Sequence, residues 1–162
     1  MRVLRRGWHT FICLHLQVFV RMYSKIVVGV DGSENAYRAL DSALSLAEKF
    51  SSEVYVLFVV HIPASAYSYD AFGSLEVFNR LEQEGRQVLA KCEEVARGRG
   101  MTVHTELSSG DPAQRIIEFA SACGAELIIV GSRGMGRLER LLMGSVAERV
   151  VRFAKSPVLI VK

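Results

Sequence analysis

The chain has 162 residues, of which 50% are hydrophobic and 23% are charged, the composition of one globular domain with a sizeable core. Residues 1–21 hold four of its 20 Lys and Arg residues, and the remaining 16 are matched by 17 acidic residues, so bulk charge gives no support to a nucleic-acid partner. Three cysteines without a Cys-x-x-Cys pair argue against a disulfide framework and a structural zinc site, and favour a reducing, cytoplasmic compartment.

Residues 1–21 form a segment of their own, with a basic start and a mostly apolar remainder. The pattern loosely resembles a signal peptide, but His9, His15 and Gln17 interrupt it and no small-residue cleavage site precedes Met22. The segment is also too short and too polar to span a membrane. We therefore treat it as an N-terminal extension, either an over-long start or an appended arm, with an interaction arm and an export segment as the weaker alternatives.

From residue 25 onward, apolar runs alternate with helical patterns. Residues 25–30 read KIVVGV, a run that is typical of a strand buried on both faces of a parallel sheet. Ser33 is a suitable N-cap for a helix over 36–50, and 53–60 predicts a second buried strand. A polar and aromatic loop over 61–74 is longer than the usual connection.

The alternation continues through the middle of the chain. A long helix with its apolar stripe beginning at Phe78 is expected to close at residues 98–100. Residues 101–107 predict a strand near an edge of the sheet, and 125–130 predict another buried strand. Between these two strands, Asp111-Pro112 is a compact helix start, with Asp as N-cap and Pro in the first turn.

The last two elements are a helix that follows Gly144-Ser145 and a strand over 156–162. Five strands that alternate with helices over about 140 residues favour an open parallel sheet with helices on both faces. We therefore predict a single α/β domain over residues 22–162. Arg149, together with Arg152 and Lys155 late in the last helix, is expected to form a solvated face.

Two motifs lie where ligands bind in such folds, beyond the carboxyl ends of the strands. Asp31 follows the first strand in VGVDGS. Gly131 and Gly134 follow the fourth strand, and Gly144-Ser145 opens the next helix after nine further residues. If the first and fourth strands are neighbours, Asp31 and Gly131 face each other across the sheet edge.

The glycine segment is open to two interpretations on spacing alone. Glycines let successive backbone N–H groups point into one concavity, and a helix N-terminus favours phosphate, so the segment could hold a nucleotide. Arg137 or Arg140 could then reach a terminal phosphate. Alternatively, the glycines only make a turn and relieve helix packing. The segment is not a P-loop, because no Gly-Lys-Ser/Thr follows at the required spacing.

Three stretches carry a resemblance to a known family. VGVDGS, GSRGMGRLERLLMGS and SPVLIVK together resemble the universal stress protein family, and the similarity covers residues 23–162. The Gly-x-x-Gly, nine residues, Gly-Ser arrangement resembles the signature of the ATP-binding branch. The resemblance implies a Rossmann-like five-stranded sheet in the order 3-2-1-4-5, with ATP at the point where the strand order reverses.

The resemblance also implies roles for particular residues. Asp31 would contact the ribose or a Mg²⁺ ion bound to the phosphates, and the backbone of Val59 would meet adenine. The phosphates would be held by Gly131, Arg133, Gly134, Gly144 and Ser145. A homodimer through the last strand is implied as well, and an apolar strand at a sheet edge is suited to such pairing.

Three functions are carried forward. The first is a cytoplasmic ATP-binding regulatory protein, acting on a protein partner that the sequence does not name. The second is a slow Mg-dependent ATPase, and the third is a dimeric adaptor that works without nucleotide. The loop at 61–74, with Tyr67, Tyr69, Asp70 and Phe72, is either a lid over the nucleotide or ordinary surface.

Overall fold

Five parallel strands form one sheet in the order β3-β2-β1-β4-β5. A computed structural model describes residues 22–61, 71–134 and 143–162, with only the backbone of residues 71–74. The strands are β1 (Lys25–Val30), β2 (Glu53–Val60), β3 (His104–Ser109), β4 (Leu127–Gly131) and β5 (Val158–Val161). The strand order and the parallel pairing confirm the predicted open α/β sheet.

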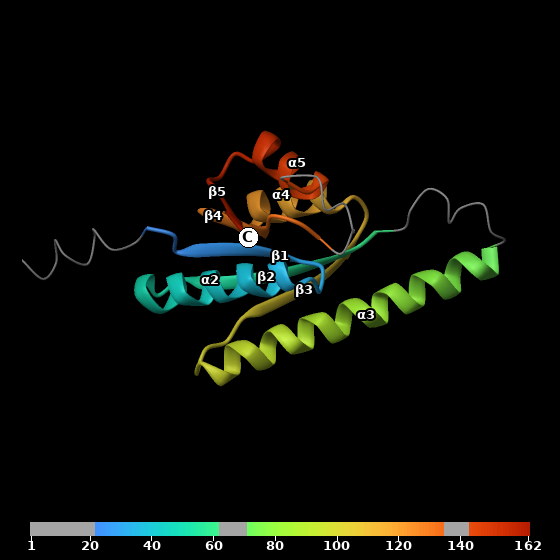
Figure 1. Cartoon of the computed structure of the whole chain (residues 1–162), viewed down its shortest axis with the longest axis horizontal. Helices are drawn as coiled ribbons and strands as arrows, with labels where there is room; N and C mark the ends of the chain where they lie inside the picture. The colour runs from blue at the N-terminus through green and yellow to red at the C-terminus, as the bar shows by residue number, and fades with distance from the viewer. Residues whose placement is uncertain (1–21, 62–70, 135–142) are drawn as a thin grey trace, which may run out of the picture.

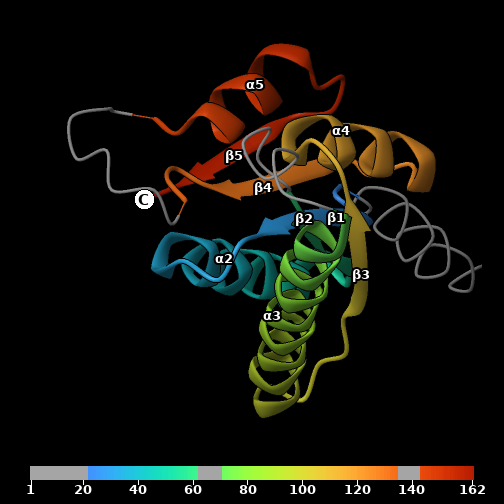
Figure 2. The same ribbon diagram turned by 90° about the vertical axis from the view of Figure 1, so that its right-hand side faces the viewer.

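Helices cover both faces of the sheet (Figure 1). On one face lie α2 (Glu34–Phe50) and α3 (Ala71–Gly98), and on the other lie α4 (Pro112–Cys123) and α5 (Ser145–Phe153), as Figure 2 shows. Successive side chains of β1 enter opposite cores: Val28 packs in the α2–α3 cluster and Val27 in the α4–α5 cluster. Both are fully buried, because a central parallel strand is covered on both faces.

The predicted helix starts at Ser33 and Asp111 are confirmed. The Ser33 hydroxyl accepts a hydrogen bond from the Ala36 N–H at 3.2 Å, and the Asp111 carboxylate accepts one from the Gln114 N–H at 2.9 Å. Each bond satisfies a backbone donor that has no partner within its own helix. These caps fix where the chain turns from a strand end into α2 and α4.

The largest departures from the expected boundaries are at β3 and at the start of α3. The third strand begins at His104 instead of residue 101, because the Met101 N–H donates to the Ala96 carbonyl at 3.0 Å and closes the end of α3. It continues to Ser109, since an edge strand needs only backbone pairing, here with the end of β2. The expected loop over 61–74 is also too long, because α3 already begins at Ala71. The first turn of this helix contains a glycine and has weak helix propensity, so the sequence did not predict it as helical.

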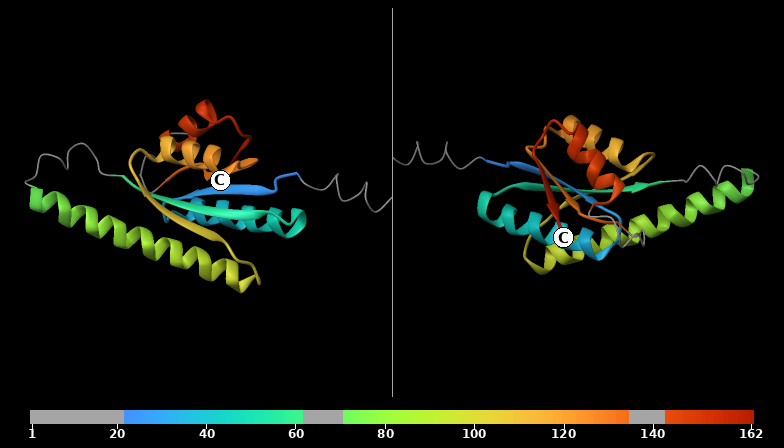
Figure 3. Two further views of the ribbon diagram at one scale, coloured as in Figure 1. Left: turned by 180° about the vertical axis from the view of Figure 1, so that it is seen from behind. Right: turned by 45° about the horizontal axis from the view of Figure 1, so that its top comes forward.

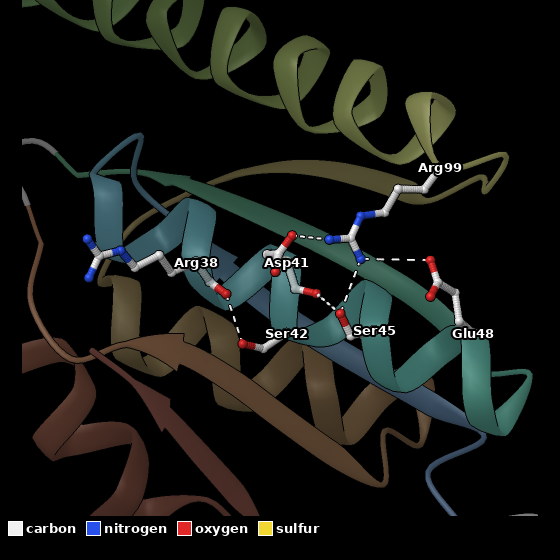
Figure 4. A network of polar contacts seen from close by, with 6 residues as sticks. All are labelled: Arg38, Asp41, Ser42, Ser45, Glu48 and Arg99. Carbon is white, nitrogen blue, oxygen red and sulfur yellow. Dashed lines mark hydrogen bonds and ion pairs between the residues drawn. The ribbon is translucent and has the colours of Figure 1, made fainter.

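Arg99, just after α3, ties the end of that helix to α2 (Figure 4). Its guanidinium contacts the Asp41 carboxylate, donates to the Ser45 hydroxyl at 3.2 Å and lies 3.8 Å from the Glu48 carboxylate. Single surface ion pairs contribute little, but one Arg that joins three groups of a neighbouring helix restricts how the two helices slide. The network holds α2, whose first turn follows Asp31, in register with the rest of the domain.

The first turns of α3 extend past the sheet (Figure 3), and the helix meets the sheet closely at Gly85. A Cβ atom at Gly85 would lie 2.7 Å from the Phe58 ring and 2.8 Å from a Leu107 methyl carbon. Glycine is therefore favoured here by the closeness of the helix to the side chains of β2 and β3, despite its poor helix propensity.

We expect Gly85→Ala to lower the free energy of unfolding by about 1–2 kcal/mol, because overpacking against Phe58 and Leu107 outweighs a propensity gain of about 1 kcal/mol. Gly98→Ala is the matched control, since a Cβ there meets nothing within 4 Å. It should be neutral or stabilising in the same urea titration. If Gly85→Ala is as stable as Gly98→Ala, the close packing of α3 on the sheet is wrong.

Candidate functional site

Asp31 begins a tight turn between β1 and α2. Its carboxylate oxygen Oδ1 accepts a hydrogen bond from the Ser33 N–H at 3.0 Å, and Gly32 between them has a φ of +85°. That backbone conformation is rare for residues with a side chain, so the glycine allows the turn. The turn holds the Asp31 carboxylate at the carboxyl edge of the sheet, beside the end of β4.

The glycine segment leaves and re-enters the sheet edge at one place. After β4, the Ser132 N–H donates to the Val161 carbonyl of β5 at 2.6 Å, and Ser132 is 4% exposed. The Gly144 N–H then donates back to the Ser132 carbonyl at 2.8 Å. A Cβ atom on Gly144 would lie 3.4 Å from the Arg133 Cα atom, so both ends of the segment touch.

The first motif and the glycine segment are in direct contact. The Ser33 hydroxyl donates to the Arg133 carbonyl at 3.4 Å. A Cβ atom on Gly134 would overlap the Asp31 Oδ2 atom, and one on Gly131 would lie 2.9 Å from the backbone of Asn35 in α2. Glycine at 131 is therefore required by the approach of α2 to β4, whereas a side chain at 134 would have to displace the Asp31 carboxylate.

The helix that follows the glycine segment has an N-terminus without a side-chain cap. Gly144 is the N-cap residue of α5 and makes no side-chain hydrogen bond, whereas α2 is capped by Ser33 and α4 by Asp111. Helix N-termini carry free N–H groups and the positive end of the helix dipole. Together with the glycines beside it, this N-terminus presents backbone N–H groups of the kind that bind an anion.

The structure brings most of the predicted site residues together. Asp31, Arg133, Gly134 and Gly144 are linked by the contacts above, Gly131 packs against α2, and Ser145 is the exposed first residue of α5. Val59 lies at the same edge near the end of β2, with β1 between it and β4. Arg137, Arg140, Tyr67, Tyr69 and Asp70 lie outside the described residues, as does the side chain of Phe72.

Ser33 and Ser132 were not predicted as site residues. Ser33 was assigned only a capping role, yet its hydroxyl also reaches the Arg133 carbonyl. Ser132 joins β5 and Gly144 through its backbone alone. A serine next to a glycine could have drawn attention to Ser132, but a backbone contact has no signature in the sequence.

A second polar cluster joins α4 to α5 at this edge. The Arg149 guanidinium donates from Nη1 to Asp111 Oδ2 at 2.5 Å. Arg149, Arg152 and Lys155 are all exposed, which confirms the expected solvated face, and the ion pair of Arg149 is a further contact that the sequence did not indicate. The pKa of the Asp111 carboxyl is lowered from its ordinary value of 3.8, mainly by the hydrogen bond from Arg149 and to a smaller extent by the one from the backbone N–H of Gln114. His61 Nδ1 lies 3.2 Å from the Gly110 carbonyl, next to the same pair.

Over the described ranges, no group of three or more His, Cys, Asp and Glu side chains is arranged to hold a metal ion. The helices of the same ranges include none with the length and apolarity needed to cross a bilayer.

Comparison with known proteins gives matches over nearly the whole chain. The sequence model of the universal stress protein family matches residues 22–162. Universal stress protein MJ0531 of Methanocaldococcus jannaschii is 39% identical, over 94% of this chain and 95% of the relative.

Solved structures match as well. The structure of protein MJ0577 of Methanocaldococcus jannaschii has a TM-score of 0.78 at 30% identity, covering 87% of this chain and 96% of that one. A universal stress protein in complex with cAMP has a TM-score of 0.63 at 27% identity, covering 87% and 98%. The Archaeoglobus fulgidus protein in complex with dAMP has a TM-score of 0.60 at 26% identity, covering 87% and 99%.

The lowered pKa of Asp111 leads to a pH-dependent stability. A carboxyl whose pKa is lowered on folding stabilises the folded state above its unfolded pKa, and this contribution is lost as pH falls through the folded pKa. We expect Asp111→Asn, which keeps an N-cap but no charge, to lose less stability than the parent between about pH 5 and pH 2. If urea titrations give the parent and Asp111→Asn the same slope of unfolding free energy against pH, the ion pair of Asp111 with Arg149 does not lower the pKa of Asp111.

Proposed function

The chain belongs to the universal stress protein family, and we propose that it acts as a cytoplasmic ATP-binding regulatory protein. The nucleotide would occupy the carboxyl edge of the sheet, between the Asp31 turn and the glycine segment. The observation that carries the proposal is the contact of Asp31 with Gly134, next to the meeting of Gly144 with Ser132 and Arg133. Asp31, the three glycines Gly131, Gly134 and Gly144, and the N-terminus of α5 therefore lie together at the carboxyl edge of the sheet.

The residues present fit an adenine nucleotide. Free N–H groups at the start of α5, the Ser145 hydroxyl and the backbone of Gly131, Arg133, Gly134 and Gly144 would hold phosphates, because a helix N-terminus and a glycine-rich backbone present N–H donors to an anion. Asp31 would bind the ribose or a phosphate-bound Mg²⁺ ion, which would neutralise phosphate charge. The backbone at Val59 would meet the adenine ring.

Solved relatives support an adenine nucleotide as the ligand class. Two of them are complexes with cAMP and dAMP, and each covers 87% of this chain. The preference for a triphosphate rests on the resemblance of the spacing of Gly131, Gly134 and Gly144-Ser145 to the signature of the ATP-binding branch of the family.

A regulatory role is favoured over catalysis. Hydrolysis requires a positioned water and a group that orients it, besides the ion that stabilises the phosphates. Among the described residues, Asp31 is an acid in contact with the glycine segment, and one of its oxygens already accepts from the Ser33 N–H. We therefore expect stoichiometric binding of ATP with negligible turnover, so that occupancy itself conveys information to a protein partner.

The test is to identify any nucleotide released on denaturation by mass spectrometry and to titrate the emptied protein with ATP and Mg²⁺ by calorimetry. Gly134→Val should weaken ATP binding at least about tenfold, or about 1.4 kcal/mol, because the side chain displaces Asp31. Gly98→Val is the matched control and should bind like the parent, since a Cβ there meets no atom within 4 Å.

The alternatives give different results in the same experiment. A parent protein that neither retains nor binds ATP would overturn the nucleotide proposal and favour a nucleotide-independent adaptor. Catalytic release of phosphate by the parent, abolished in Asp31→Ala, would instead establish an ATPase. Retention of AMP or ADP without affinity for ATP would contradict the triphosphate assignment.

We also propose a homodimer through β5. This strand is at the edge of the sheet, and Leu159 on it is 38% exposed. Val151 and Phe153 on the neighbouring α5 are 45% and 60% exposed. Apolar side chains beside an unpaired strand edge favour pairing with a second copy.

Leu159→Lys should shift the protein from dimer to monomer in light scattering coupled to size-exclusion chromatography, because a charge on an edge strand opposes pairing. Val95→Lys is the control, since Val95 on α3 is similarly exposed at 37% but lies on another part of the surface. A parent that is monomeric at all concentrations, or a Leu159→Lys protein that remains dimeric, would contradict the proposed interface.

A further inference from the structure

The ion pair of Asp111 and Arg149 connects two parts of the sheet edge that lie 38 residues apart in the chain. Asp111 caps α4, and Arg149 projects from α5, the helix whose N-terminus follows the glycine segment. The two helices pack side by side on one face of the sheet (Figure 2). The pair therefore links α5 to whatever holds Asp111 in place.

Asp111 is held by a hydrogen bond to its own side chain and by two contacts of the preceding residue, Gly110. Its Oδ1 atom accepts from the Gln114 N–H at 2.9 Å, which fixes it to the first turn of α4. The preceding Gly110 N–H donates to the Val60 carbonyl at 3.0 Å, and His61 Nδ1 lies 3.2 Å from the Gly110 carbonyl. Asp111 thus moves with the end of β2, the strand that carries Val59.

Arg149 lies on the same short helix as the N-terminus of α5, so the two move together. It lies four residues, about 6 Å along the helix axis, from Ser145. The Glu148 N–H donates to the Gly144 carbonyl at 3.0 Å, so the first turn is formed and moves as one unit. Fixing Arg149 therefore limits the rotation and sliding of α5, and with it the direction of the free N–H groups at Ser145.

We propose that Asp111 and Arg149 are positioning residues that aim the N-terminus of α5 at the phosphates of the bound nucleotide. This inference rests on the proposed function. Neither residue needs to touch the ligand: Asp111 provides a fixed point at the end of β2, and Arg149 transfers that position to α5. The pair would couple the adenine end of the site to its phosphate end.

If the ion pair of Asp111 and Arg149 only stabilised the fold, a different result would be expected. The Arg149 and Asp111 side chains are 48% and 33% exposed, so the pair contributes modestly to global stability. If it served stability alone, its loss would weaken all ligands equally or none of them. If it aims α5, its loss should weaken ligands with phosphates and spare adenosine, which has none.

The experiment compares the affinities for ATP with Mg²⁺ and for adenosine by calorimetry in the full-length chain. Asp111→Asn retains a capping side chain, and Arg149→Met retains the aliphatic stem. Each should lower ATP affinity about three- to tenfold and leave adenosine affinity unchanged, and the double variant should be no worse than either single one. Arg152→Met is the control, because it removes a cation from the same helix without contacting Asp111, and should bind both ligands like the parent.

Every other outcome is decisive. ATP affinity within twofold of the parent in both variants, or an equal loss for ATP and adenosine, would overturn the positioning role while the nucleotide site stands. Additive losses in the double variant would show that the residues do not act as a pair. A parent that binds neither ligand would overturn the proposed function itself, and with it this inference. Melting temperatures without nucleotide identify any variant that fails to fold, and Arg149→Lys, which keeps the charge, should then recover part of the ATP preference.

Discussion

The hydrogen bond from the Gly144 N–H to the Ser132 carbonyl is the constraint on which the candidate site depends. It returns the chain, after an excursion, to the point where it left β4, and so places the start of α5 beside the end of that strand. Because Ser132 also donates to β5, the same residue fixes the edge of the sheet. The contact of Gly134 with Asp31 adds the turn after β1, so that parts of the chain about 100 residues apart share one location.

A parallel sheet makes this convergence possible, because all carboxyl strand ends meet at one edge. The two helical layers then hold the edge from opposite sides. On the α2 side, Ser33 caps the helix and contacts Arg133, while Arg99 holds α2 against the end of α3. On the α4–α5 side, the Asp111–Arg149 pair connects the end of β2 with the helix that follows the glycine segment. The candidate site thus lies between helices on both faces of the sheet.

Much of this arrangement could be predicted from the sequence because it depends on local chemistry. Apolar runs such as KIVVGV, the caps at Ser33 and Asp111, and the glycines after β4 each reflect a short-range requirement of the backbone. The remainder depends on contacts between distant residues. The pairing of Arg149 with Asp111 and the second contact of Ser33 produce no pattern in the sequence. The strand β3 begins later than predicted because Met101 belongs to the turn that closes α3. The resemblance to the universal stress protein family supplied the strand order, which periodicity alone does not determine.

A crystal structure of the protein with ATP and Mg²⁺ would show whether the Asp31 turn and the glycine segment together form a site for a triphosphate. We expect phosphate density at the N-terminus of α5, within hydrogen-bonding distance of the Gly144-Ser145 backbone, with the ribose or the ion at Asp31. Nucleotide bound at another part of the surface, or crystals grown at saturating ATP with none at this edge, would contradict this expectation.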